Sequence, residues 1–328
     1  MYPNRGQGIM KKILVTGGAG FLGANLCRKI LRDFTDVKVI CIDNLHTGCM
    51  KNLTDMIEDS RFEFKKGDIN ELDSQNFNLN VDEIYNFACP ASPIHYQKDP
   101  IYTMRTNVVG VINLLELARR CGAKILQAST SEVYGNPVLK MQPETYTGNV
   151  NCIGVRACYD EGKRSAEALM FDFHRMYNVD IKVVRIFNTY GQGMRCDDGR
   201  VVSNFIVQCL SNQNITIYGD GLQTRSLCYV DDLLDGIIKM MQSNAVIIGP
   251  VNLGNPEEHT INDLAKKIIR LTNANSRIVY CPLPSDDPQC RKPDISLAKS
   301  VLNWYPTISL EVGLLKTIAW FKAQMEMI

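Results

Sequence analysis

Tyr159 and Lys163 form a Tyr-x-x-x-Lys pair, a spacing that places both side chains on one face of a helix. A tyrosine with a reference pKa of about 10 is a poor base at neutral pH, but a neighbouring ammonium group favours the phenolate. Such a pair also arises by chance, so its context matters. It follows Thr130 and Ser131, whose hydroxyl groups could hydrogen-bond an alcohol that loses a proton. We therefore expect Tyr159 to accept a proton from an alcohol, with Lys163 in support.

A glycine-rich segment near the N-terminus predicts a dinucleotide site. Gly17, Gly20 and Gly23 follow an apolar run and open a helical pattern. This spacing allows a tight turn, close approach of the backbone to a pyrophosphate, and phosphate binding at the helix N-terminus. Asp43 ends the second apolar run, where a carboxylate bonds the ribose hydroxyls of NAD and repels the 2′-phosphate of NADP. Asp68 follows the third run and suits the adenine edge, or a turn or cap.

Short β-branched runs alternate with helical patterns through the first part of the chain. The sequence predicts strands at residues 12–16, 37–43, 61–65, 83–88, 124–129 and 181–187. It predicts helices at residues 21–33, 102–121, 159–177, 231–242, 261–272 and 310–325. Continuous apolar strands between helices indicate an α/β fold with a doubly wound, Rossmann-type parallel sheet.

The sequence pattern changes after residue 188, where shorter predicted elements are separated by Gly, Pro and Asn. We expect an NAD-binding domain at 11–188, with a return of the chain near 226–255. A smaller C-terminal substrate-binding domain is expected at 189–225 and 256–328, closing over the carboxyl edge of the sheet. Residues 1–10 are expected to be a flexible tail.

Composition excludes several classes of protein. Lys and Arg number 36 against 35 Asp and Glu, so no global field favours nucleic acid or an anionic membrane. Apolar residues make up 45%, which is typical of a globular chain. We find no apolar run of the length that spans a bilayer and no signal-peptide pattern, so we expect a soluble protein. The 12 cysteines contain no C-x-x-C pair and predict free thiols in the cytoplasm and no metal site.

Several blocks of sequence extend this pattern beyond the generic fold. The chain resembles the extended short-chain dehydrogenase/reductase family, and within it the UDP-glucuronate decarboxylases, from about residue 11 to the C-terminus. The blocks that carry the resemblance are residues 89–93, 129–135, 155–164, 185–191, 198–205, 251–260 and 286–295. The departures are Cys89 in place of a usual serine, Asn86 and Phe87 in place of His-Leu, and residues 192–193 in place of Pro-Arg.

The resemblance implies an enzyme that oxidises C4 of a sugar with NAD and then loses CO₂ from the resulting β-keto acid. A 4,6-dehydratase of this family carries Asp-Glu after the threonine, whereas Ser131 and Glu132 follow Thr130 here. A 4-epimerase usually has no carboxylate at that position. Glu132 with Arg291 is implied to protonate C5, through water, before C4 is reduced again and Tyr159 returns its proton.

The same resemblance implies a set of binding residues and a homodimer. Cofactor contacts are implied for Gly17, Gly20, Phe21, Leu22, Gly23, Asp43, Asn44, Thr47, Gly48, Asp68, Ile69, Phe87, Cys89, Thr106, Tyr159 and Lys163. Contacts with the UDP-sugar are implied for Pro90, Arg105, Asn188, Val202, Tyr218, Arg225 and Arg291. The helices at 102–121 and 159–177 are implied to form the dimer interface of the family.

Other interpretations of these residues stay open at the level of sequence. Glu132 could cap a helix, Arg291 could grip the diphosphate or form a surface salt bridge, and Tyr218 could belong to the core. The protein could release a 4-keto pentose with reduced cofactor, or act as a nucleotide-sugar 4-epimerase. It could also be an idle NAD-binding scaffold, although such a role requires no set of Thr130, Glu132, Tyr159 and Lys163.

Overall fold

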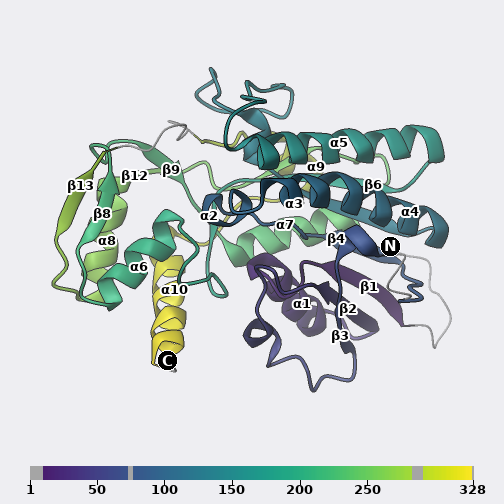
Figure 1. The fold of residues 1–328 in the computed structure, drawn as a ribbon, viewed down its shortest axis with the longest axis horizontal. Coiled ribbons are helices and arrows are strands. Elements are labelled where there is room, and N and C mark those ends of the chain that lie inside the picture. Colours follow the sequence, from purple (N-terminus) through teal and green to yellow (C-terminus); the bar gives the residue numbers. More distant parts are fainter. Residues whose placement is uncertain (1–9, 73–76, 283–290, 327–328) are drawn as a thin grey trace.

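The computed structural model describes residues 10–72, 77–282 and 291–326, and Figure 1 shows how their helices and strands are arranged. Nine of the ten residues of the expected N-terminal tail, 1–9, lie outside the described residues. Residues 286–290, the first half of the block 286–295, also lie outside them.

Seven parallel strands form the central sheet, in the spatial order β11-β6-β5-β4-β1-β2-β3. They are β1 (Lys11–Thr16), β2 (Val37–Asp43), β3 (Phe62–Lys66), β4 (Glu83–Asn86), β5 (Lys124–Thr130), β6 (Ile181–Ile186) and β11 (Val251–Leu253). The order of the strands reverses between β1 and β4, which opens a crevice at their carboxyl ends. The expected doubly wound sheet is confirmed.

Helices cover both faces of this sheet (Figure 1). Ile13 and Val15 of β1 join the buried cluster on the side of α1 (Phe21–Asp33) and α7 (Val230–Gln242). Leu14, between them, joins the cluster on the opposite side with Leu114 of α4 (Val111–Cys121) and Met170 of α5 (Ala157–Tyr177). Successive side chains of a strand point to opposite faces, so a strand covered on both faces is apolar throughout.

The helix expected at residues 102–121 is present and contains a π-helical turn that the sequence did not indicate. The structure has α3 (Pro100–Arg105), a π-helical turn (Thr106–Gly110) and then α4. Asn107 and Thr106 donate side-chain hydrogen bonds to the carbonyl oxygens of Thr103 and Tyr102, at 3.0 and 2.9 Å, and compete with the backbone ladder. Turns of this kind often occur at functional sites, and Thr106 lies beside a cavity described below.

The remaining elements lie mostly in the C-terminal part, which forms the left side of Figure 1. The additional helices are α2 (Pro93–Tyr96), α6 (Val201–Leu210), α8 (Ile261–Thr272), α9 (Ser296–Leu302) and α10 (Leu310–Met325). The additional strands form three pairs: β7 (Thr189–Tyr190) with β10 (Cys228–Tyr229), β8 (Ile215–Tyr218) with β13 (Ile278–Cys281), and β9 (Thr224–Ser226) with β12 (Glu258–Thr260). Short 3₁₀ helices occupy Met50–Leu53, Ile69–Glu71 and Ser131–Tyr134.

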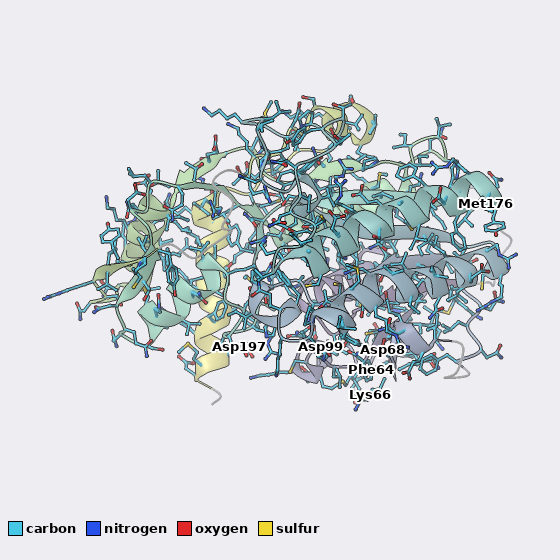
Figure 2. All side chains as sticks on the ribbon, turned by 45° about the horizontal axis from the view of Figure 1, so that its top comes forward. Phe64, Lys66, Asp68, Asp99, Met176 and Asp197 are labelled. Atoms are coloured by element: carbon cyan, nitrogen blue, oxygen red, sulfur yellow. The ribbon has the colours of Figure 1, made fainter. Side chains whose placement is uncertain are left out.

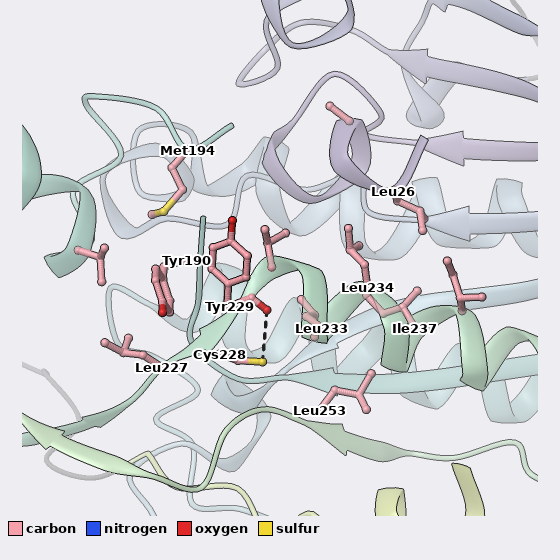
Figure 3. Close-up of a cluster of buried hydrophobic side chains, with 14 of the residues drawn as sticks. Leu26, Tyr190, Met194, Leu227, Cys228, Tyr229, Leu233, Leu234, Ile237 and Leu253 are labelled. Carbon is pink, nitrogen blue, oxygen red and sulfur yellow. Dashed lines mark hydrogen bonds between the residues drawn. The ribbon is translucent and has the colours of Figure 1, made fainter. Parts of the chain in front are cut away.

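One continuous apolar cluster joins this C-terminal part to the sheet (Figure 3). Leu233 and Ile237 of α7 pack in it with Leu26 of α1, and Tyr190 and Met194 extend it beyond the sheet. Burial of each such side chain contributes about 1.5–3 kcal/mol. The cluster therefore holds the two parts of the chain in a fixed relation around the crevice.

Within the three described ranges, no helix combines the length and the apolar character needed to cross a bilayer.

Candidate active site

The turn from β1 into α1 forms a cradle for a phosphate group. Gly17 has φ +67°, and a Cβ there would lie 2.7 Å from the carbonyl carbon of Phe87. A Cβ at Gly23 would lie 2.2 Å from the carbonyl oxygen of Gly17. Gly20 caps α1 without a side-chain hydrogen bond, so the first N–H groups of α1 and its positive dipole end remain available to an anion. This cradle fits the pyrophosphate of a dinucleotide.

Asp43 lies at the carboxyl end of β2, close to this cradle. Its carboxylate accepts hydrogen bonds from the backbone N–H groups of Ala19 (3.0 Å) and Leu45 (2.7 Å). Burial raises the pKa of Asp43, and these two N–H groups act in the opposite direction. Gly48 packs directly on it, because a Cβ at Gly48 would lie 2.7 Å from the Asp43 carboxylate.

Asp68 lies just beyond β3, near Phe64 and Lys66 in Figure 2. One carboxylate oxygen caps the following 3₁₀ helix by accepting from the N–H of Asn70, at 2.8 Å. The other accepts from the hydroxyl of Tyr102 (2.7 Å) and the amide of Asn44 (2.9 Å). Asp68 is therefore a cap residue that also faces the cavity beside the cradle.

A cavity of about 150 Å³ at the cradle, here called the glycine-loop cavity, collects most residues expected to contact the cofactor. Those that line it are Gly17, Gly20, Phe21, Leu22, Gly23, Asp43, Asn44, Thr47, Asp68, Ile69, Phe87, Cys89 and Thr106. Gly48 does not line it and instead packs on Asp43, while Tyr159 and Lys163 line the adjoining cavity.

A larger cavity of about 610 Å³, here called the Tyr159 cavity, adjoins the first and shares Leu22, Phe87, Cys89, Ala91 and Arg200 with it. It brings together the residues expected to act on a substrate: Thr130, Ser131, Glu132, Tyr159, Lys163, Asn188, Val202, Tyr218, Arg225 and Arg291. Two residues are placed differently. Pro90 lines the glycine-loop cavity, and Arg105 is exposed and lines neither cavity.

Tyr159 and Lys163 lie on α5 beside the end of β5, and both are buried. The Lys163 ammonium donates to the carbonyl oxygen of Ala128 (2.9 Å) and lies 5.8 Å from the centre of the Tyr159 ring. Burial raises the pKa of Tyr159 above its usual range, and a hydrogen bond with Thr130 opposes this. Burial also lowers the pKa of Lys163. The positive charge of the neighbouring Lys163 favours the phenolate and so acts against the effect of burial on Tyr159.

Glu132 lies between two guanidinium groups at the end of β5. Arg291 donates to it from Nε (3.2 Å) and Nη2 (3.0 Å), and Arg156 forms a short ion pair with it. Burial would raise the pKa of Glu132, but the charges of Arg291 and Arg156 outweigh it and hold the pKa at about 2. Glu132 is therefore an anion at neutral pH, and its carboxylate is suited to hold a water molecule by accepting its hydrogen bond.

The structure decides several questions that the sequence leaves open. Thr130, and not Glu132, caps the 3₁₀ helix, because the Thr130 hydroxyl accepts from the N–H of Glu132 (3.2 Å). Arg291 is only 3% exposed and so forms no surface salt bridge. Tyr218 is 49% exposed on the wall of the Tyr159 cavity and lies outside the core.

Among the residues of the Tyr159 cavity that the sequence did not indicate are Tyr96, Arg156 and Arg200. The ring of Tyr96 stacks on that of Tyr159, with centroids 4.9 Å apart and planes at 6°. Arg156 precedes Tyr159 by one helical turn, so its position next to the pair was a usable signal. Tyr96 ends the four-residue helix α2 and Arg200 directly precedes α6, and neither position belongs to a stretch long enough for periodicity to indicate where the side chain points.

Within residues 10–72, 77–282 and 291–326, no three His, Cys, Asp or Glu side chains are grouped in a way that could hold a metal ion.

Comparisons with known proteins agree with this geometry. Residues 13–254 match the NAD dependent epimerase/dehydratase family. UDP-glucuronic acid decarboxylase 3 of Arabidopsis thaliana is 50% identical over 303 residues, which are 92% of this chain and 86% of the relative. UDP-glucuronic acid decarboxylase 1 of Danio rerio is 48% identical over 316 residues, which are 96% of this chain and 74% of the relative. The solved structure of UDP-glucuronic acid 4-epimerase from Bacillus cereus, with UDP-glucuronic acid and NAD, has a TM-score of 0.84 at 28% identity, covering 95% of this chain and 99% of that chain.

Proposed function

The chain belongs to the NAD dependent epimerase/dehydratase family, within the extended short-chain dehydrogenases/reductases, and from this premise we propose that it is a UDP-glucuronate decarboxylase. It converts UDP-glucuronate to UDP-xylose and CO₂. The observation that carries this proposal is the salt bridge of Glu132 with Arg291 in the cavity that also holds Tyr159.

Residues at the end of β5 and on α5 carry out the first step, the oxidation of the sugar at C4. NAD would be held in the glycine-loop cavity by Gly17, Gly23 and Asp43, and there it would supply the hydride acceptor for C4 of the sugar and the hydride donor at the end of each turnover. Tyr159 takes the proton of the C4 hydroxyl as general base, and Thr130 or Ser131 hydrogen-bonds that hydroxyl. Lys163 stands beside Tyr159 and supplies the positive charge that favours the phenolate.

Oxidation at C4 makes the sugar a β-keto acid. The bond from C5 to the carboxylate then breaks, CO₂ leaves, and the electron pair is delocalised as an enolate onto the C4 oxygen. A proton must next be added at C5. Glu132, held ionised by Arg291 and Arg156, positions the water that delivers this proton, and the hydroxide that remains takes up a proton from the solvent. When the hydride is returned to C4, Tyr159 returns its own proton to the C4 oxygen.

Binding of the rest of the substrate is assigned to the walls of the Tyr159 cavity. Asn188, Val202, Tyr218 and Arg225 line it from the C-terminal part of the chain. Arg291 has its Nη1 atom buried without a hydrogen-bond partner in the described part of the chain. An unpaired buried guanidinium N–H is costly, so an anionic group of the substrate is its natural acceptor.

Incubation with UDP-glucuronate and NAD, followed by mass spectrometry, tests this function. The expected result is loss of CO₂ and formation of UDP-xylose without accumulation of reduced nicotinamide. A 4-keto pentose together with reduced nicotinamide would identify a decarboxylase that releases its intermediate. A product with the carboxylate retained and C4 inverted would identify a 4-epimerase, and unchanged substrate would indicate an NAD-binding scaffold.

We also propose that the two parts of the chain bind different ligands. Residues 11–188 and the return near 226–255 form the NAD-binding domain, and 189–225 with 256–328 form the nucleotide-sugar-binding domain. Support comes from β11, which belongs to the sheet, from α7, which packs on it, and from the pairs β8–β13 and β9–β12, which lie apart from it in Figure 1.

The proposal also covers the oligomeric state of the protein and its cellular compartment. The protein forms a homodimer through α3, the π-helical turn, α4 and α5, which pack together. Their exposed apolar side chains include Ile101, Val109, Met176 and Tyr177, and Figure 2 shows Met176 near the C-terminal end of α5. It works in the cytoplasm, which agrees with the free state of all cysteines that the structure describes. A monomer in sedimentation equilibrium at micromolar concentration would contradict the dimer.

A further inference from the structure

Asp160 is a buried carboxyl group that the mechanism above does not use. It follows Tyr159 on α5, and its side chain is only 10% exposed. Its Oδ1 atom is buried and has no hydrogen-bond partner among the residues that the structure describes. Its Oδ2 atom lies 3.8 Å from Nε of Arg156. A buried carboxylate with one unpaired oxygen is costly, so the environment favours the protonated form.

Arg156 connects Asp160 to the reacting end of the Tyr159 cavity. Its Nε atom faces Asp160, and its Nη2 atom forms the ion pair with Glu132. Arg291 lies on the same Glu132 carboxylate and is 3% exposed. Asp160 does not line the cavity, whereas Arg156, Glu132 and Arg291 do. Asp160 therefore acts on a ligand only through its neighbours, above all Arg156.

The charge of this cluster depends on one proton. Two guanidinium groups and the Glu132 carboxylate give a net charge of +1 while Asp160 is protonated, and zero once Asp160 is ionised. A substrate carboxylate brings one negative charge, so the protonated form matches it and the ionised form leaves an excess of negative charge in a buried site.

The groups that face Asp160 come from several elements: Arg156, Cys158 and Glu161 on α5, Glu132 on the 3₁₀ helix, Tyr96 on α2, and Arg291 before α9. Burial, followed by the charge of Glu132, raises the pKa of Asp160 to about 7, against the opposing charges of Arg156 and Arg291. The Asp160 carboxyl group therefore titrates in the neutral pH range.

We propose that Asp160 is a positioning residue that sets, through Arg156, the net charge of the site receiving the substrate's carboxylate, so that only its protonated form favours a carboxylate-bearing sugar. The proposal rests on the proposed function, because it concerns the carboxylate that the enzyme removes. It predicts that recognition of UDP-glucuronate weakens as the pH rises through the titration of Asp160. Binding of a sugar without the carboxylate does not weaken in the same way.

The test compares two ligands on the wild-type enzyme with NAD present. KM for UDP-glucuronate and the inhibition constant of UDP-glucose are measured from about pH 6 to about pH 9, where the ligand's own carboxyl group stays ionised. A coupling of about one pK unit between the two carboxyl groups raises KM about tenfold over this range. The inhibition constant of UDP-glucose is expected to change less than about twofold. A constant ratio of the two values across this range overturns the proposal without any variant.

Asp160→Asn supplies the second arm, because an amide keeps the neutral form at every pH. KM of this variant for UDP-glucuronate should stay at the low-pH value of the wild type. Asp172→Asn is the matched control on the same helix, since Asp172 pairs with Arg175 on the exposed surface and should keep the wild-type profile. A merely structural Asp160 would lower the unfolding temperature and leave the slope of KM with pH intact, and that outcome also overturns the proposal.

If Asp160→Asn does not fold, Asp160→Ser is the substitute, and the ligand comparison on the wild type remains decisive. Failure of the proposed function has a different signature, because the enzyme then releases no CO₂ at any pH. An enzyme that releases CO₂ with a pH-independent ratio of the two constants refutes only the role of Asp160.

Discussion

Replacement of Glu132 by glutamine separates the chemistry after oxidation from the oxidation itself. Glutamine keeps the shape of the side chain but removes the negative charge of Glu132, which forms ion pairs with Arg156 and Arg291. Folding holds the pKa of Glu132 at about 2, against an ordinary value of 4.5. This difference corresponds to about 3 kcal/mol of folding free energy at neutral pH. Because the folded pKa is lowered, this stability is present above about pH 4.5 and is lost as the pH falls toward about 2.

Glu132→Gln should therefore lower the unfolding temperature by about 4 °C, from about 3 kcal/mol and the unfolding entropy of a chain of this length. Turnover to UDP-xylose should fall about 10²–10⁴-fold, the usual value of positioned acid–base assistance. Hydride transfer from C4 should survive in part, because Tyr159 and Lys163 are untouched. Any residual turnover should therefore leave more reduced nicotinamide and 4-keto sugar behind.

Thermal unfolding followed by circular dichroism, chromatography of UDP-xylose and absorbance of reduced nicotinamide give the three readouts. In D₂O the product should carry deuterium at C5. Glu63→Gln is the control, since Glu63 pairs with Lys38 and Lys65 at the far edge of the sheet and is 35% exposed; such pairs contribute about 0–1 kcal/mol. If Glu132→Gln unfolds and turns over like the wild type, Glu132 is neither ionised by its arginines nor part of the reaction.

Tyr159→Phe should keep NAD binding and lose at least about 10²-fold in turnover, because only the proton acceptor is removed; a variant with most of the wild-type rate would show that another group is the base. The wild-type protein should bind NAD more tightly than NADP, since the carboxylate of Asp43 repels a 2′-phosphate, and equal dissociation constants in calorimetric titrations would refute this assignment. Gly23→Ala should unfold at a lower temperature than Gly20→Ala and bind NAD poorly, because its Cβ would lie 2.2 Å from the Gly17 carbonyl oxygen, against 3.2 Å for Gly20. The reverse order of unfolding temperatures would contradict the close packing of helix and turn.

The elements of the sheet were predictable because their signals are local. A strand covered on both faces must be apolar at every position, which is why β2 was placed residue for residue at 37–43. The helices α1 and α8 were placed with their observed bounds for a similar reason, since each carries one apolar face and recognisable ends. The bounds of α10 were also predicted, although Val312 and Leu315 are apolar residues on its exposed side.

Prediction failed where contacts from elsewhere decide the local structure. The π-helical turn between α3 and α4 depends on the side chains of Thr106 and Asn107 and on the close approach of Gly110 to Ile69. The short pairs such as β8 with β13 join segments distant in the sequence, and neither strand has enough residues to show a period. Arg105 was expected at the substrate, but it lies on an exposed part of α3.

The sequence by itself determined two local motifs of this protein, the Gly17–Gly23 turn and the Tyr159–Lys163 pair. Each of them depends only on the spacing of residues along a turn or a helix. The tertiary structure alone decided how the Glu132 carboxylate is used. Its partner Arg291 is 159 residues away in the chain, and Arg156 reaches it from α5. The protonation of Glu132 and Asp160 follows from burial and from charges that meet only where the carboxyl edge of the sheet joins the C-terminal part, and no pattern along the chain carries that information.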